Sequence, residues 1–253
     1  MKSRSILLFS LIALAWSASF VQAEDPEQPL PSAREVFDRF VEVTNAEKIE
    51  NHDSRKVVGT FSIPSQGLNG NMVVWQKAPN LRYSEVELPG VGKVREGFDG
   101  TEAWEMNPMV GPRVFEGDVL QQKMNESNYY LGLYRPEDIE AAEVVGRSTF
   151  DGEEAWEVDL TRAGGQRSKE YFSIESGLML GGTMEVVDPM GTFPARTQMG
   201  RYEELDGVVV ATQVTTTVMG QQFIMLIDEV SHEEIEESVF ELPAEIEAMV
   251  SQD

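Results

Sequence analysis

A two-residue alternation of apolar and polar side chains begins at Arg55 and recurs along most of the chain. Val57, Phe61 and Ile63 alternate with polar or smaller residues, and turn residues over 64–70 then interrupt the pattern. Such alternation indicates strands, because successive side chains leave opposite faces of a strand. Short strands between regular turn signals predict an antiparallel meander of about ten or eleven strands. Apart from the hairpins below, we expect strands over residues 55–63, 72–76, 81–88, 91–98, 167–174, 178–187, 192–202, 208–219 and 222–230.

Helices are expected before and within this meander. Ser32 and Glu35 have the spacing of a capping box, and apolar residues follow at helical spacing to Val43. Residues 117–134 also read as helical until Arg135 and Pro136, and a short helical tail follows Pro243. No linker-like segment divides the chain, so we expect one α+β domain over residues 24–253.

One segment occurs twice. Residues 98–105 and 150–157 are identical at seven of eight positions, 52 residues apart, and 205–207 is a weaker third copy. Each Asp-Gly pair suits the two positive-φ positions of a type I′ turn, which predicts a two-residue hairpin with a packed Trp. A ligand-binding loop is the alternative interpretation.

The first 23 residues have the pattern of a secretory signal peptide. Lys2 and Arg4 precede an uncharged run over residues 6–20, and Ala23 ends a signal-peptidase motif. We expect cleavage after Ala23, with an uncleaved anchor as the alternative. No Cys is present for lipid attachment, and no later segment is long and apolar enough for a transmembrane helix. The sequence therefore predicts a periplasmic or secreted protein.

The charge restricts the possible partners. Forty-four acidic and 20 basic residues give a net charge of -24, which argues against binding to nucleic acid or to anionic headgroups. Acidic residues at turns and alternate strand positions keep sheet edges apart, so we expect a monomer. The composition leaves apolar lipid tails open as ligands.

The chain offers little for catalysis or metal binding. Without Cys and with two His, it cannot form a disulfide, a thiol nucleophile or a His-rich metal site. Glu105 and Glu157 flank the Trp of the two repeats, and we interpret them as solubilising residues of exposed hairpins. We therefore expect no enzyme activity, no catalytic residue, no metal and no cofactor. An acidic hydrolase is the alternative.

Several short segments, in this order, resemble the LolA-like family, the outer-membrane lipoprotein-sorting proteins and their relatives. They are Val58-Gly59-Thr60-Phe61, Lys77-Ala78-Pro79-Asn80, Gly97-Phe98-Asp99-Gly100, Tyr171-Phe172, Tyr202 with Asp206-Gly207, and Val239-Phe240-Glu241-Leu242-Pro243. The resemblance implies an incomplete β-barrel whose concave apolar face is covered by the N-terminal helix and the inserted helical segment. The chain resembles the soluble carrier of the family, since the anchoring Cys of the receptor is absent.

This resemblance implies a periplasmic carrier of lipid or lipoprotein acyl chains. The alternative is a non-enzymatic scaffold for an envelope protein partner, with a barrel filled by side chains. Met residues within strands suit variable apolar ligands, although ordinary core filling explains them too. We predict that the apolar cavity is lined by Phe61, Ile63, Val74, Tyr83, Trp104, Met106, Met184, Phe223 and Met225.

Overall fold

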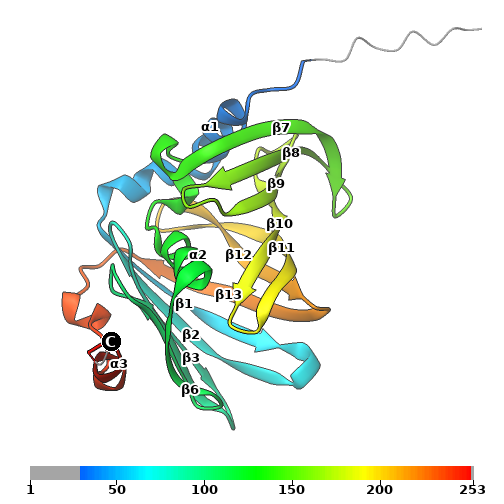
Figure 1. Cartoon of the computed structure of the whole chain (residues 1–253). Coiled ribbons are helices and arrows are strands. Elements are labelled where there is room, and N and C mark those ends of the chain that lie inside the picture. The colour runs from blue at the N-terminus through cyan, green and yellow to red at the C-terminus, as the bar shows by residue number, and fades with distance from the viewer. Residues whose placement is uncertain (1–28, 252–253) are drawn as a thin grey trace, which may run out of the picture.

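One curved antiparallel sheet of thirteen strands forms the body of the protein (Figure 1). The computed structural model describes residues 29–251, so the expected signal peptide lies outside the described residues. The strand order is β6-β5-β4-β3-β2-β1-β13-β12-β11-β10-β9-β8-β7, with β6 and β7 at the open edges. This confirms an incomplete β-barrel. The strands are β1 (Ser54–Ile63), β2 (Leu68–Lys77), β3 (Leu81–Leu88), β4 (Gly92–Phe98), β5 (Ala103–Asn107), β6 (Gly111–Phe115), β7 (Ile139–Phe150), β8 (Glu153–Arg162), β9 (Arg167–Ser173), β10 (Met179–Asp188), β11 (Gly191–Leu205), β12 (Val208–Val218) and β13 (Gln221–Ser231).

Within the described residues, three α-helices and several short 3₁₀ helices accompany the sheet. The predicted capping box opens the first helix, because Ser32 Oγ accepts from the Glu35 amide and the Glu35 carboxylate accepts from the Ser32 amide. The α-helices are α1 (Ala33–Thr44), α2 (Gly117–Ser127) and α3 (Ala244–Val250), and the 3₁₀ helices are η1 (Ala46–Asn51), η2 (Pro64–Gln66), η3 (Leu131–Leu133), η4 (Pro136–Asp138) and η5 (Glu237–Phe240).

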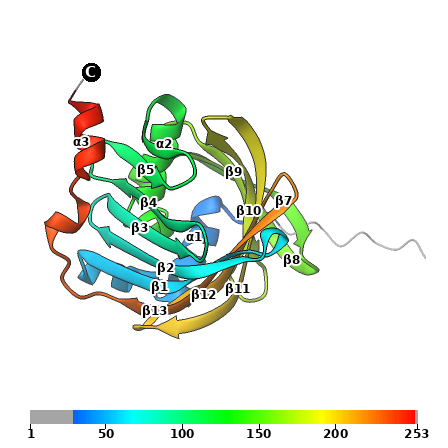
Figure 2. The ribbon, with the colours of Figure 1, turned by 90° about the horizontal axis from the view of Figure 1, so that it is seen from below.

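α1 and α2 pack on the inner face of the sheet. Phe37 of α1 joins Leu160 and Phe172 in one apolar cluster over β7–β9. Phe98, Ala103 and Phe115 form another cluster over β4–β6, against Val119 and Leu120 of α2. A third cluster joins η1 and the 129–133 segment to Val208 of β12. Figure 2 shows α1 (blue) within the curve of the sheet and α3 (red) outside it. The predicted inner covering by an N-terminal and an inserted helix is confirmed.

The inserted helix is shorter than predicted. It ends at Ser127 and not at Tyr134, because the chain turns away to bind the β2–β3 loop. Tyr129 donates its amide to the Pro79 carbonyl at 3.0 Å, and Asn128 Oδ1 accepts from the Tyr130 amide. The buried Tyr129 ring then joins the cluster beneath η1.

The two repeats form different turns. Asp151 and Gly152 both have positive φ and join Phe150 directly to Glu153, as a two-residue hairpin requires. In the first copy Phe98 pairs with Ala103, so the loop has four residues. There the Asp99 carboxylate accepts from the Thr101 and Glu102 amides. The prediction of a type I′ turn is thus wrong for the first copy and right for the second.

Candidate functional site

The inner face can be traced residue by residue through the strand register. Paired residues of neighbouring antiparallel strands, and residues two apart on one strand, share a face. One such row runs from Leu160, which lies in the α1 cluster, through Ser168, Met184 and Ala195 to Val218. Met184 therefore lies on the inner face, as predicted for a cavity residue.

The central part of the inner face carries five further predicted residues. Arg55 of β1 packs over the Tyr129 ring, under the helices. Phe61 and Ile63 lie an even number of residues further along β1, so their side chains point to the same face. Met225 pairs with Phe61, and the Phe61 and Phe223 rings stack at 6.2 Å between centroids. Val74 pairs with Val57 on the same face. The register thus brings Phe61, Ile63, Val74, Phe223 and Met225 together.

These central side chains are half-buried. None of them belongs to the three core clusters that α1, η1 and α2 form within residues 29–251. The helices cover the flanks of the inner face, and the strip of β1, β2 and β13 between them remains partly accessible to solvent. An apolar strip of this kind is the usual mark of a binding surface.

Tyr83, Trp104 and Met106 lie on the outer face, which corrects the prediction that they line the cavity. Tyr83 pairs with Gly97, and Gly97 pairs with Trp104, so the three share one face. Gly97 directly precedes Phe98, which faces inward, so this shared face is the outer one. Met106 follows Trp104 at the same parity.

The C-terminal segment covers part of this outer surface. Trp104 is buried, and the Tyr83 ring lies 6.0 Å from it, under residues 239–243. An outer cavity of about 330 Å³ remains there, lined by Tyr83 and Trp104 with Trp75, Arg95, Val239, Glu241 and Pro243. The two tryptophans of the repeats thus differ in environment, because Trp156 pairs with Phe172 and packs on the α1 cluster.

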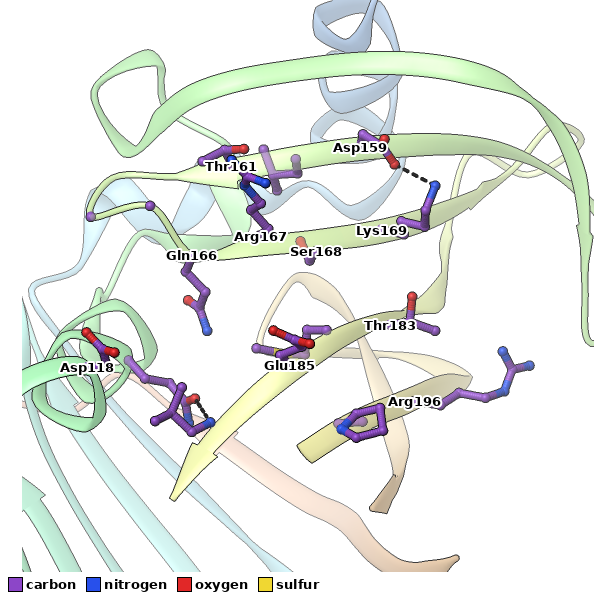
Figure 3. Close-up of a pocket in the computed structure, with 18 of the residues that line it drawn as sticks. Asp118, Asp159, Thr161, Gln166, Arg167, Ser168, Lys169, Thr183, Glu185 and Arg196 are labelled. Atoms are coloured by element: carbon purple, nitrogen blue, oxygen red, sulfur yellow. Dashed lines mark hydrogen bonds and ion pairs between the residues drawn. The ribbon is translucent and has the colours of Figure 1, made fainter. Parts of the chain in front are cut away.

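A groove of about 1300 Å³ opens where β9 and β10 separate (Figure 3). The two strands pair as far as Ser168 and Met184, and β10 then continues to Asp188 with β11 as its remaining partner. α2 lies across the gap. Its Gln122 Oε1 accepts from the Val187 amide at 2.8 Å, and its Asn125 donates to Gln166 at 2.9 Å. The groove therefore has the β8–β9 turn, the end of β10 and α2 as its walls.

The groove combines an apolar floor with a charged mouth. Leu160, Met184 and Ala195 of the inner row line it together with Arg167 and Asp118. At its edge, Lys169 donates to Glu157 at 2.7 Å and to Asp159 at 2.8 Å. These hydrogen bonds, the one to Asp159 first, raise the pKa of Lys169 above its usual range. Of this groove, sequence analysis had found only Met184.

An ion-pair cluster fixes α2 on the inner face. Glu96 accepts from Lys123 of α2 at 3.0 Å and from Arg82 of β3 at 2.9 Å. Burial alone would raise the pKa of Glu96, but Lys123 and Arg82 together hold it below the usual range. The charged form of Glu96 is thus stabilised where α2 crosses β4.

The residues considered for catalysis are engaged elsewhere. Glu105 forms an ion pair with Arg113, and Glu157 forms one with Lys169. Across the described chain, 29–251, no group of three or more His, Asp or Glu residues is placed to hold a metal ion. No helix in this range has both the length and the hydropathy needed to cross a membrane.

The chain's two histidines lie together, which the sequence did not indicate. His52 and His232 stack with 4.3 Å between ring centroids, and His232 Nδ1 lies 2.7 Å from an Asp206 oxygen. This hydrogen bond lowers the pKa of Asp206. The contact joins the end of β13 to the β11–β12 turn.

Neither a family model nor a curated protein matches the sequence. Solved structures do match. A LolA superfamily protein from Nitrosomonas europaea is 13% identical over 84% of this chain and 99% of its own, with a TM-score of 0.57. The chain has the LolA-superfamily fold. A DUF1329 family protein from Desulfovibrio piger matches 82% of this chain and 96% of its own at 13% identity and a TM-score of 0.55. The LolA-like resemblance is thereby confirmed at the level of the fold.

Proposed function

We propose that this protein is a non-enzymatic carrier that binds the acyl chains of a lipid or lipoprotein on the inner face of its half-barrel. The observation that carries the proposal is the half-buried apolar strip around Phe61, Phe223 and Met225, which no core cluster of the described residues includes. Such a strip gains free energy when an acyl chain covers it, at about 0.8 kcal/mol for each buried CH₂ group.

The groove supports the same function. Its volume of about 1300 Å³ lies above the roughly 300–1,000 Å³ typical of small-molecule pockets. Met184 on its floor belongs to the inner face, so a chain bound along the inner face could extend into the groove. A scaffold with an interior filled by side chains, the alternative function, would not need this space.

We place the carrier in the bacterial envelope, as a periplasmic or secreted monomer. The signal-peptide pattern of residues 1–23 and the LolA-superfamily fold support this location. The surplus of acidic side chains keeps its unpaired sheet edges from associating. Light scattering behind size-exclusion chromatography measures the oligomeric state, and a mass of twice the chain would contradict the monomer.

The test is lipid binding by the exported chain. Native mass spectrometry should detect a lipid-sized adduct, and a fluorescent fatty acid should bind saturably and be displaced by unlabelled fatty acid. The carrier function fails if neither experiment detects a lipid.

The absence of catalysis has its own test. Hydrolase screening of the wild type and of the Glu105→Gln and Glu157→Gln variants should show no turnover. Turnover that either substitution abolishes would overturn that part of the proposal.

A further inference from the structure

The turns at one end of the barrel contain no charged residue. Hairpin turns of an antiparallel sheet alternate between its two ends, and the register places six of them at the end where β1 stops. We call these turns the uncharged rim. They span residues 64–67, 89–91, 108–110, 163–166, 189–190 and 219–220. In Figure 1 the cyan β1–β2 turn and the yellow β10–β11 turn lie toward the bottom, away from α1.

Four of the five turns at the opposite end are acidic. The five turns span residues 78–80, 99–102, 151–152, 174–178 and 206–207, and their charged residues are Asp99, Glu102, Asp151, Glu175 and Asp206. The charges of the turns thus differ between the two ends, although two strand-end carboxylates reach the rim, where Asp188 accepts from the Met190 amide and Glu140 from the Gly164 amide, both at 2.9 Å. In a protein with 44 acidic residues, an end whose turns carry none is unlike the rest of the surface.

The uncharged rim also carries the most exposed apolar side chains. Met190 is 85% exposed, Met219 76%, Met109 70% and Val110 63%, the four highest values for large apolar residues within 29–251. Each lies in a turn, directly next to a Pro or Gly residue. Exposing these apolar side chains to water costs free energy. A surface that covers them is therefore expected to bind the rim.

We propose that the uncharged rim docks onto the surface of a lipid bilayer, with Met109, Met190 and Met219 entering the interfacial region. Separate flexible tips match a fluid phase, which closes around each side chain. A protein partner would instead need a contiguous, closely packed apolar centre. The acidic turns at the far end favour the same orientation, because they are repelled from anionic headgroups.

The groove opens at this rim, which connects docking with cargo. Met219 and Gly220 of the β12–β13 turn line it, as do Gly164 and Gly165 of the β8–β9 turn. A bilayer that met the rim would lie at the groove mouth, so an acyl chain could pass between membrane and inner face without crossing water. This inference rests on the proposed carrier function.

The test is flotation with phosphatidylcholine vesicles. The wild-type chain should float with the vesicles, and the Met109→Ser/Val110→Ser/Met190→Ser variant, which spares the groove-lining Met219, should partition at least about tenfold less. The matched control is Leu30→Ser/Val145→Ser/Met249→Ser, which removes exposed apolar side chains away from the uncharged rim and should float like the wild type. Adding phosphatidylglycerol should weaken flotation, since the chain has a net charge of -24.

Fatty-acid titration without vesicles separates docking from carriage. The rim variant should bind fatty acid like the wild type, because Met109, Val110 and Met190 are not among the residues that line the groove. Docking is overturned if the wild type does not float, if the rim variant floats equally well, or if the rim proves to join two copies and only the wild type is dimeric. If the wild type does not bind fatty acid, the carrier function is overturned instead.

Discussion

The side chain of Gln122 on α2 accepts a hydrogen bond from the backbone amide of Val187 on β10, at 2.8 Å. Gln122 is buried, and its amide nitrogen donates to Glu126 at 2.9 Å. β9 has already separated from β10 at this point. A helix side chain therefore occupies the place of a strand partner, and α2 becomes one wall of the groove.

Replacing Gln122 by Ala should loosen this wall. Val187 would lose its acceptor, and because it is half-buried beside the groove we expect a cost toward the lower end of the about 1–3 kcal/mol for a buried unpaired amide. We expect faster hydrogen exchange at Val187 and faster release of bound fatty acid. The control is Gln121→Ala on the same helix, because Gln121 bonds to Asn125 and not to Val187, so protection at Val187 should be unchanged. Equal exchange in the wild type and Gln122→Ala would contradict a structural role for this contact.

The ion pair between Lys123 and Glu96 should hold α2 over a defined pH range. The pKa of Glu96 is lowered from its ordinary value of 4.5, so its stabilisation is present above pH 4.5 and lost as the pH falls through the lower folded-state pKa. Burial opposes the charge of Lys123, but Glu96 and Glu126 raise its pKa above the ordinary 10.5. Its stabilisation is therefore present below pH 10.5 and lost as the pH rises through the raised pKa.

Lys123→Met should remove the pair at neutral pH. Glu96 would keep Arg82 as its partner, so we expect a cost of about 1–3 kcal/mol, less than for a buried charge left wholly unpaired. Urea denaturation at pH 7 measures this cost, and hydrogen exchange of α2 locates it. Lys93→Met is the control, because Lys93 pairs with Glu85 from the protein surface, where solvent screens the interaction. Equal destabilisation by the two variants would rule out a special role for Lys123.

Local sequence signals predicted the elements that local interactions stabilise. The capping box of Ser32 and Glu35 begins α1, and the Asp206-Gly207 pair takes the positive φ values of its turn. Only the hairpin end of β7 was predicted, because its register shifts twice, between Ile139 and Ala141 and between Val144 and Gly146, which breaks the alternation. β6 has five residues and contains Pro112, which a strand tolerates at a sheet edge.

Assigning residues to the inner or outer face needed the tertiary structure. On β5, Ala103, Trp104 and Glu105 are all buried, because α2 covers one face and the C-terminal segment covers the other. Alternation separates such residues into two faces without saying which is inside. The groove could not be predicted from the sequence either, since it depends on the contact of Gln122 with Val187, 65 residues away along the chain.

Neighbouring residues of β13 allow the inner face to be tested against the outer one. Met225 pairs with Phe61 on the inner face, and Leu226 pairs with Thr60 on the opposite face. Met225→Asp should weaken fatty-acid binding at least about tenfold, because a carboxylate would have to be desolvated under the acyl chain. Leu226→Asp should bind like the wild type. Equal losses in both variants, with folding verified by circular dichroism, would contradict binding on the inner face.

Gly97 should be intolerant of a side chain. A Cβ atom at this position would lie 2.6 Å from the Trp104 ring, which the C-terminal segment covers. The Trp104 indole nitrogen has no hydrogen-bond partner within residues 29–251, so packing alone holds the ring. Gly97→Ala should therefore cost about 1–3 kcal/mol in urea denaturation and increase hydrogen exchange in α3.

The matched control for that substitution is Gly200→Ala. Gly200 also lies in a strand, β11, and a Cβ atom there would meet no heavy atom of the described chain within 4 Å. Its stability should stay close to that of the wild type, and exchange in α3 should be unchanged. If Gly97→Ala denatured at the same urea concentration as Gly200→Ala, the close packing of Trp104 under the C-terminal segment would be refuted.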